Sequence, residues 1–187
     1  LNLTNELEEA RKIQMGMLPQ EIPEIPGFEI SAHSTPAAAV GADFYDFIPL
    51  GSDKLGIVVG DAVGHGIAAA LLMTMALTDF RLLASREPSA EAVLNGVNRR
   101  LTQSMQTSTS FVTSIYVLLD FASNRLTCAM AGTQPWRIKA KSHQCIPIEP
   151  SGDRFPLGAS SGIMYQSCDV EMDTGDSLVF YTDGIPE

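Results

Sequence analysis

The chain has 187 residues, of which 45% are hydrophobic and 18% are charged, a composition typical of one globular domain and not of a disordered chain. Its formal net charge is −10, from 12 basic and 22 acidic residues. This acidic excess argues against nonspecific binding to nucleic acid or to an anionic membrane surface.

The first twenty residues predict a helix, because apolar residues recur every three or four positions with charged residues between them. Gln14 interrupts this apolar stripe. The helix could pack on its own domain, or it could continue an upstream coiled coil and carry a signal or a dimer contact. Prolines between residues 19 and 26 then predict an extended connector, and residues 28–34 a strand. We therefore expect a linker helix over 1–20 and one domain over 21–187.

Residues 41–60 predict a β-hairpin, because two apolar runs flank a Gly-Ser-Asp turn. If Leu50 pairs with Lys54 across this turn, Asp43 falls directly opposite Asp61. Directly opposed residues share one face of the sheet, with Cβ atoms about 5 Å apart. The prediction depends on register, since a slip of one residue would move one of the acids to the other face.

Two carboxylates at this separation repel each other unless a cation lies between them. Ligands that are all oxygen favour Mg²⁺, Mn²⁺ or Ca²⁺ over zinc. Asp61 has a simpler alternative role, as a cap of the helix that follows. Asp46 should face away from Asp43 on an ideal strand, so it is the weaker ligand candidate and is better explained as a solvated or turn-bonding acid.

A Gly-His-Gly turn follows Asp61 and leads into a helix predicted from Ile67 to about Ser85. This helix is apolar on most sides, so it should lie inside the fold. His65, in the turn, could donate a proton or contact a phosphate, or it could be a plain turn residue. A second helix should begin after Ser89, which is a favourable N-cap.

The second half of the chain changes to the period of β-strands, with helices confined to the first half. This order predicts an α+β fold, with antiparallel sheets and helices packed outside. The last strand again ends in an acid, within Thr182-Asp183-Gly184. The expected hairpins are Phe111–Asp120 with Arg125–Ala131, Trp136–Lys141 with Gln144–Ile148, and Tyr165–Met172 with Ser177–Tyr181.

The three cysteines, Cys128, Cys145 and Cys168, are too far apart for a CxxC site and indicate ordinary thiols in a reducing compartment. The longest uncharged run, Ala62–Thr78, contains the Gly-His-Gly turn and is too short to span a bilayer. We therefore expect a cytoplasmic location without membrane insertion.

Motifs for common nucleophiles and nucleotide sites are missing from the sequence. It contains no GxSxG elbow, no HExxH helix and no cysteine phosphatase loop, and Gly60–Gly66 lacks the lysine of a nucleotide P-loop. What remains is carboxylates at strand ends. Such sets hold two divalent ions that activate an attacking water for displacement at phosphorus, so no protein nucleophile is required.

Six ordered motifs resemble the metal-dependent protein phosphatases (PPM), and most closely the bacterial stage II sporulation protein E (SpoIIE) branch that includes sigma-factor regulatory phosphatases. The resemblance runs from about Glu6 to Glu187. The motifs are PAAAVGADFYDF, VVGDAVGHGIAAALLM, FVTSIYVLLD, AGTQPW, FPLG and LVFYTDGIPE.

The resemblance implies a β-sandwich of two antiparallel sheets flanked by helices (αββα), and Mn²⁺- or Mg²⁺-dependent hydrolysis of phosphoserine or phosphothreonine. By motif, Asp43, Asp61 and Asp183 match metal ligands, with Asp61 bridging two ions and the carbonyl of Ala62 as a backbone ligand. It also implies a phosphorylated STAS-type anti-anti-sigma substrate, and an N-terminal helix that links the domain to an upstream sensor.

The sequence departs from this family pattern in three places. Ala42 stands where a second glycine is usual, and Thr133 where histidine is common. The family also continues past the Thr-Asp-Gly motif to a further acidic ligand, whereas this sequence ends first, which leaves the activity of this stretch by itself open. The alternative function is a non-catalytic module that uses the same fold to bind a partner or switch a dimer.

Overall fold

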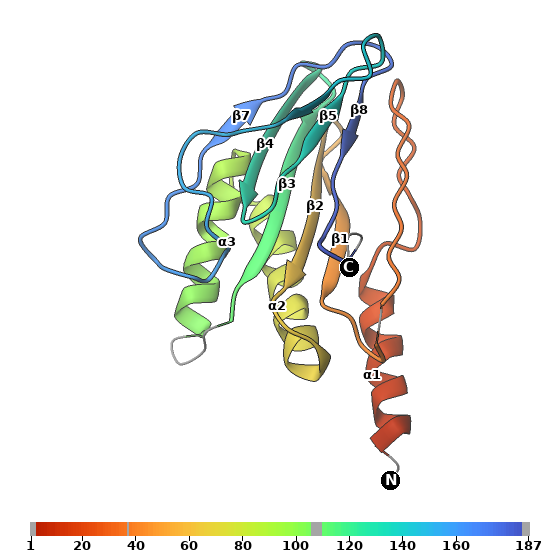
Figure 1. The fold of residues 1–187 in the computed structure, drawn as a ribbon, viewed down its shortest axis with the longest axis vertical. Coiled ribbons are helices and arrows are strands. Elements are labelled where there is room, and N and C mark those ends of the chain that lie inside the picture. The colour runs from red at the N-terminus through yellow and green to blue at the C-terminus, as the bar shows by residue number, and fades with distance from the viewer. Residues whose placement is uncertain (1–2, 37, 106–109, 185–187) are drawn as a thin grey trace.

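The computed structural model describes residues 3–36, 38–105 and 110–184 (Figure 1). In this part of the chain, five strands form an antiparallel sheet in the order β1-β2-β3-β4-β7, and three short strands form a second sheet in the order β6-β5-β8. The strands are β1 (Asp43–Leu50), β2 (Lys54–Ala62), β3 (Val112–Asp120), β4 (Arg125–Ala131), β5 (Trp136–Ile138), β6 (Cys145–Pro147), β7 (Ser167–Asp169) and β8 (Ser177–Val179).

Two helices, α2 (Gly66–Ala84) and α3 (Ala90–Ser104), pack side by side on one face of the five-stranded sheet (Figure 1). The third helix, α1 (Leu3–Met17), lies next to the β1 edge. This arrangement confirms the α+β fold with two antiparallel sheets. It divides the core into a layer between the helices and the large sheet, and a second layer between the two sheets.

The alternation of side chains along a strand assigns each residue of β1 and β2 to one layer. Even-numbered residues such as Phe44 and Val58 face the helices, whereas odd-numbered residues such as Phe47 and Ile57 face the second sheet. Asp46 therefore belongs to the helix face. Asp43 and Asp61 belong to the opposite face.

Glycines in β2 let aromatic side chains approach the strand closely on its helix face. A Cβ atom at Gly60 would lie 2.5 Å from Cζ of Phe44, and one at Gly56 would lie 2.5 Å from Oη of Tyr116. The ring of Phe80, from α2, lies 6.2 Å from that of Phe44 and 5.9 Å from that of Tyr116. These contacts fix α2 on the sheet directly behind the two acids.

Helix α2 is long and apolar enough to cross a membrane by length and composition alone. Half of its apolar window is buried against the rest of the fold, and core helices of folded domains pass the same test. The prediction that this helix lies inside the fold is confirmed by its buried residues, which include Met73, Leu77 and Phe80.

The structure confirms the hairpin register and the start of α3. Leu50 pairs with Lys54, and the ladder continues to Asp43 opposite Asp61. The Ser89 side chain accepts a hydrogen bond from the backbone N–H of Ala92, as a helix N-cap does. The strands predicted around residues 136–148 also form and pair, although each is only three residues long.

Two strand predictions are wrong. Residues 28–34 are extended without joining a ladder, because the chain there makes only an isolated bridge between Ile25 and Phe28. The predicted hairpin around Gly175 does not form either. Its first strand, β7, pairs with β4, and its second, β8, pairs with β5 in the other sheet. Long-range partners therefore override the local turn signal.

Helix α1 contacts the domain only near its C-terminal end. Gln14 and Leu18 are buried, whereas Leu3 and Ile13 are 65% and 71% exposed. The last turn of α1 therefore packs on the domain, as one of the two alternatives predicted. Most of the remaining surface of the helix is exposed.

Candidate metal centre

Asp43 and Asp61 face each other at the open end of the β1–β2 hairpin. They are directly paired across the ladder, and the backbone N–H of Ala62 donates to the carbonyl of Ala42 at 3.2 Å just beside them. Both carboxylates project from the face of the sheet that points away from α2. Regular hydrogen bonding up to this point holds the two acids as near neighbours on a rigid backbone.

The carboxylate of Asp43 has an unmatched buried oxygen. Its Oδ1 atom is inaccessible to solvent and has no hydrogen-bond partner among the residues that the structure describes. A buried carboxylate oxygen without a partner is costly, because it has lost hydration without replacement. A divalent cation between the paired carboxylates would compensate this cost, so the donor set fits a hard metal ion.

The third acid arrives on the turn after β8, which brings the chain back to the start of β1 (Figure 1). A Cβ atom built on Gly184 would lie 3.6 Å from Oδ2 of Asp43, so the Thr-Asp-Gly turn adjoins the pair. The side chain of Asp183 is exposed. Within the described ranges, no three His, Cys, Asp or Glu side chains form a group that could hold a metal. The turn thus reaches the site as predicted, while the role of Asp183 as a ligand stays a prediction.

Asp46 is neither solvated nor turn-bonding, which corrects the sequence prediction, and it lies away from the paired acids. It is 5% exposed on the helix face, where its Oδ2 accepts from Nε of Arg81 at 2.5 Å and its Oδ1 accepts from the backbone N–H of Phe47 at 2.9 Å. Arg81 also donates through Nη2 to the carbonyl of Met17 at 2.5 Å. Asp46 therefore ties β1 to α2 and to the end of α1, and its carboxylate is occupied by these contacts.

The turn between β2 and α2 needs its two glycines. Gly64 and Gly66 have φ angles of +95° and +74°, which side chains with a Cβ rarely adopt. His65 between them is exposed at the N-cap of α2, and its side chain makes no capping hydrogen bond. The roles of His65 as a phosphate contact or proton donor, and of the Ala62 carbonyl as a metal ligand, remain predictions.

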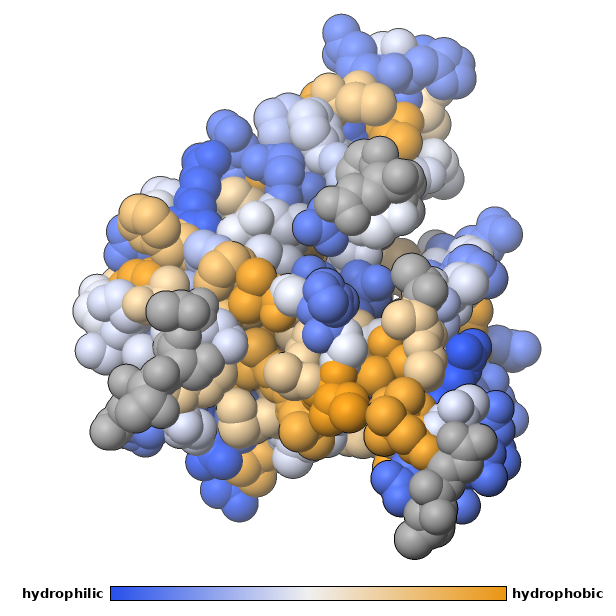
Figure 2. Space-filling view, turned by 60° about the horizontal axis from the view of Figure 1, so that its bottom comes forward, coloured by the Kyte–Doolittle hydropathy of each residue, from blue (hydrophilic) through white to orange (hydrophobic). Residues whose placement is uncertain are grey.

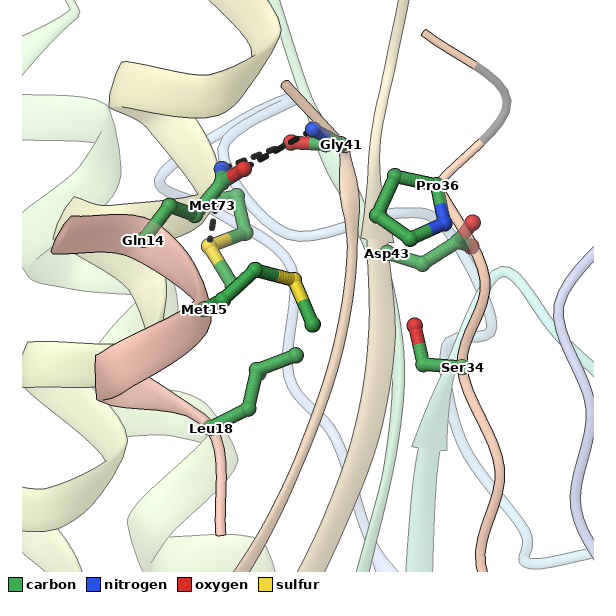
Figure 3. A pocket seen from close by; sticks show the side chains of 8 residues that line it. All are labelled: Gln14, Met15, Leu18, Ser34, Pro36, Gly41, Asp43 and Met73. Atoms are coloured by element: carbon green, nitrogen blue, oxygen red, sulfur yellow. Dashed lines mark hydrogen bonds between the residues drawn. The ribbon is translucent and has the colours of Figure 1, made fainter. Parts of the chain in front are cut away.

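No sequence motif indicated a functional role for Gln14, which the structure places against the backbone two residues before Asp43. Its side-chain amide donates to the carbonyl of Gly41 and accepts from the N–H of Gly41, both at 2.8 Å (Figure 3). In Figure 3, Gln14 and Met73 lie on one side of the strand, and Asp43 lies on the other with Pro36 and Ser34. The sequence did contain a signal that could have identified Gln14, because it is the polar residue within an otherwise apolar helical stripe.

The end of the molecule that carries the acids also exposes apolar side chains. Figure 2 shows this end, with a band of hydrophobic residues beside a hydrophilic group. Among large hydrophobic residues, Ile67 and Leu71 in the first turns of α2 are 56% and 66% exposed. The start of α2, which follows Asp61 after a short turn, therefore exposes apolar surface.

A family model for Stage II sporulation protein E (SpoIIE) matches residues 51–187. The chain belongs to the SpoIIE family. The SpoIIE-family domain is 28% identical over 186 residues to "Phosphoserine phosphatase RsbU" of Bacillus subtilis, covering 99% of this chain and 54% of RsbU. The domain thus spans about half the length of this curated relative.

Solved structures support the same fold for the SpoIIE-family domain. The SiaA-PP2C domain of Pseudomonas aeruginosa matches with a TM-score of 0.78 at 23% identity, over 97% of this chain and 72% of that one. The RsbU and RsbW domains of Rv1364c from Mycobacterium tuberculosis match with a TM-score of 0.67 at 33% identity, over 81% of this chain and 41% of that one.

Proposed function

We propose that this domain is the catalytic part of a longer protein, and that it hydrolyses phosphoserine or phosphothreonine on a protein substrate with the help of divalent cations. The observation that carries the proposal is the opposed pair of Asp43 and Asp61, with the buried, unmatched Oδ1 of Asp43. A domain that only bound partners would have no need for two opposed carboxylates, whose desolvation and repulsion are costly.

Asp43 and Asp61 would hold the cations, with Asp61 shared between two of them. The carbonyl of Ala62 and the carboxylate of Asp183 would complete the set. Oxygen donors of this kind suit Mn²⁺ or Mg²⁺. When bound, such ions supply the positive charge that favours attack by water on a phosphoester.

The residues of the domain itself would orient the reaction. The regular β1–β2 ladder keeps the paired carboxylates fixed, which limits reorganisation during the reaction. His65, exposed at the start of α2, would be placed to contact the phosphate or to donate a proton to the leaving oxygen.

For the substrate, we propose a phosphorylated STAS-type anti-anti-sigma protein in the cytoplasm, and for regulation an upstream sensor joined through α1. The similarity to a relative named a phosphoserine phosphatase supports the reaction class. Membership of the SpoIIE family supports a role in bacterial signalling. The exposed length of α1 is compatible with a linker or a dimer contact.

The test uses the full-length protein. We expect Mn²⁺-dependent hydrolysis of p-nitrophenyl phosphate and of a phosphoserine STAS protein, abolished by EDTA. Asp61→Asn should lower the rate by roughly 1000-fold, because several kcal/mol of charge stabilisation are lost.

The matched control is Asp53→Asn, which removes an exposed acid at the other end of the same hairpin and should leave the rate unchanged. Folded protein that hydrolyses neither substrate with any divalent ion would contradict the proposal. That result would favour the non-catalytic module.

A further inference from the structure

The side-chain amide of Gln14 forms hydrogen bonds with both the backbone N–H and the backbone carbonyl of Gly41. Its Nε2 donates to the Gly41 carbonyl and its Oε1 accepts from the Gly41 N–H, each at 2.8 Å, while Nε2 also lies 3.7 Å from Sδ of Met73 (Figure 3). The Gln14 side chain is 6% exposed. A buried amide with both ends satisfied fixes its partner strongly, since breaking the pair would strand buried polar groups.

Gly41 lies two residues before Asp43, in a segment that is clamped from both sides. On the side opposite Gln14, a Cβ atom at Gly41 would lie 3.3 Å from Cβ of Pro36. Just beyond Gly41, the carbonyl of Ala42 accepts from Ala62 at the start of the ladder. The position of the Asp43 carboxylate therefore depends on a short backbone segment whose free end is held by Gln14.

The same amide-to-backbone pairing occurs once more at the other edge of the sheet. Asn95 of α3 donates through Nδ2 to the carbonyl of Tyr165 at 3.0 Å and accepts through Oδ1 from the N–H of Tyr165 at 2.9 Å. This pair anchors a loop next to β7, at the edge of the sheet opposite to β1, which carries Asp43. Asn95 thus offers a matched control, with the same chemistry at a different place.

We propose that Gln14 is a positioning residue for Asp43, and that its pair of hydrogen bonds to Gly41 sets the affinity of the acidic pair for divalent cations. The inference rests on the proposed function, because it assumes that Asp43 is a cation ligand. Groups that orient a metal ligand typically change metal affinity by about 10- to 100-fold when they are removed.

The test measures Mn²⁺ affinity directly, from the electron paramagnetic resonance signal of free Mn²⁺ in titrations of the full-length protein. Gln14→Met keeps the side-chain volume but removes both hydrogen bonds, and should raise the Kd for Mn²⁺ by about 10-fold or more. Asn95→Leu should leave this Kd unchanged. Hydrogen exchange at the Gly41 amide should become faster in Gln14→Met and stay the same in Asn95→Leu.

Gly41→Ala provides a second approach that leaves Gln14 intact, in case Gln14→Met does not fold. The added Cβ meets Pro36 and should displace the segment, so the Kd for Mn²⁺ should rise in this variant as well. If folded variants at position 14 or 41 bind Mn²⁺ as wild type does, the positioning role is overturned. If Asp43→Asn and Asp61→Asn also leave Mn²⁺ binding unchanged, the proposed function itself fails, which separates the two results.

Discussion

The two faces of the β1–β2 hairpin carry acids with opposite kinds of surroundings. On the helix face of β1, the buried Asp46 accepts from Arg81 at 2.5 Å. Within the helical layer packed on that face, the buried Asp79 of α2 accepts from Arg100 of α3 at 2.5 Å in the same way. On the other face, Asp43 lies opposite Asp61, and its buried Oδ1 has no hydrogen-bond partner in the described part of the chain.

The presence or absence of an arginine partner separates structural acids from candidate metal ligands better than burial or sequence spacing does. A carboxylate whose charge is matched by an arginine contributes to folding and has little capacity left for a ligand. A carboxylate that lies opposite another carboxylate and has an unmatched buried oxygen, as Asp43 does, is stabilised when a cation binds between the two. The two kinds of acid lie three residues apart on the same strand.

The largest expected effect tests the packing on the helix face of β2, opposite to the face that carries the paired acids. Gly60→Ala should destabilise the domain by about 3 kcal/mol, because its Cβ would lie 2.5 Å from Phe44 and 2.8 Å from the carbonyl of Thr113. Urea unfolding measures this loss. Gly162→Ala, where a Cβ meets nothing closer than 3.9 Å, is the control and should change stability far less. Equal effects at both glycines would remove this packing argument.

The next effect tests the Asp43–Asp61 pair directly by thermal unfolding with and without Mn²⁺. At a hundred times its Kd, Mn²⁺ should stabilise the wild-type domain by about 2.7 kcal/mol, because it binds only the folded state. Asp43→Asn and Asp61→Asn should each abolish most of this gain, and Asp43→Asn should do so without loss of stability in EDTA, because Oδ1 of Asp43 has no hydrogen-bond partner among the described residues. A full Mn²⁺ gain in either variant would show that the pair is not the binding site.

The same experiment on the helix face should give the reverse result. Asp46→Asn leaves Arg81 without its carboxylate and should cost about 1–2 kcal/mol, less than for a fully buried pair because the Arg81 side chain is 40% exposed. The gain from Mn²⁺ should persist. Loss of the Mn²⁺ gain in this variant would break the distinction between the two faces.

The smallest effect concerns an acid of the second sheet that the protein itself compensates. The N–H of Ala140 and the guanidinium of Arg137 lower the pKa of Asp176 from 3.8 to about 2. A pKa lowered by folding gives stability that is fully present above pH 4 and is lost as the pH falls toward 2. Asp176→Asn should therefore flatten the decline in urea midpoint over this range, whereas Asp53→Asn should leave its slope unchanged.

Much of the hairpin could be predicted from the sequence, because its determinants are local. The Gly-Ser-Asp turn between two apolar runs sets the register, and that register alone places Asp43 opposite Asp61. The cap at Ser89 and the buried helix after Gly66 follow from equally local patterns. The fold class and the candidate ligands on β1 and β2 were therefore within reach of the sequence.

Contacts between distant segments were decided only by the tertiary structure. The partner of Asp46 lies 35 residues away and that of Gln14 lies 27 residues away, so no local pattern distinguishes them from solvated residues. Strands β7 and β8 join different sheets for the same reason, since pairing with β4 and β5 outweighs a good turn. The sequence by itself determined which acids face each other, because register is a local property. Which acids are neutralised by arginines, and which residue holds the strand of Asp43, depended on how α1 and α2 pack on the sheet.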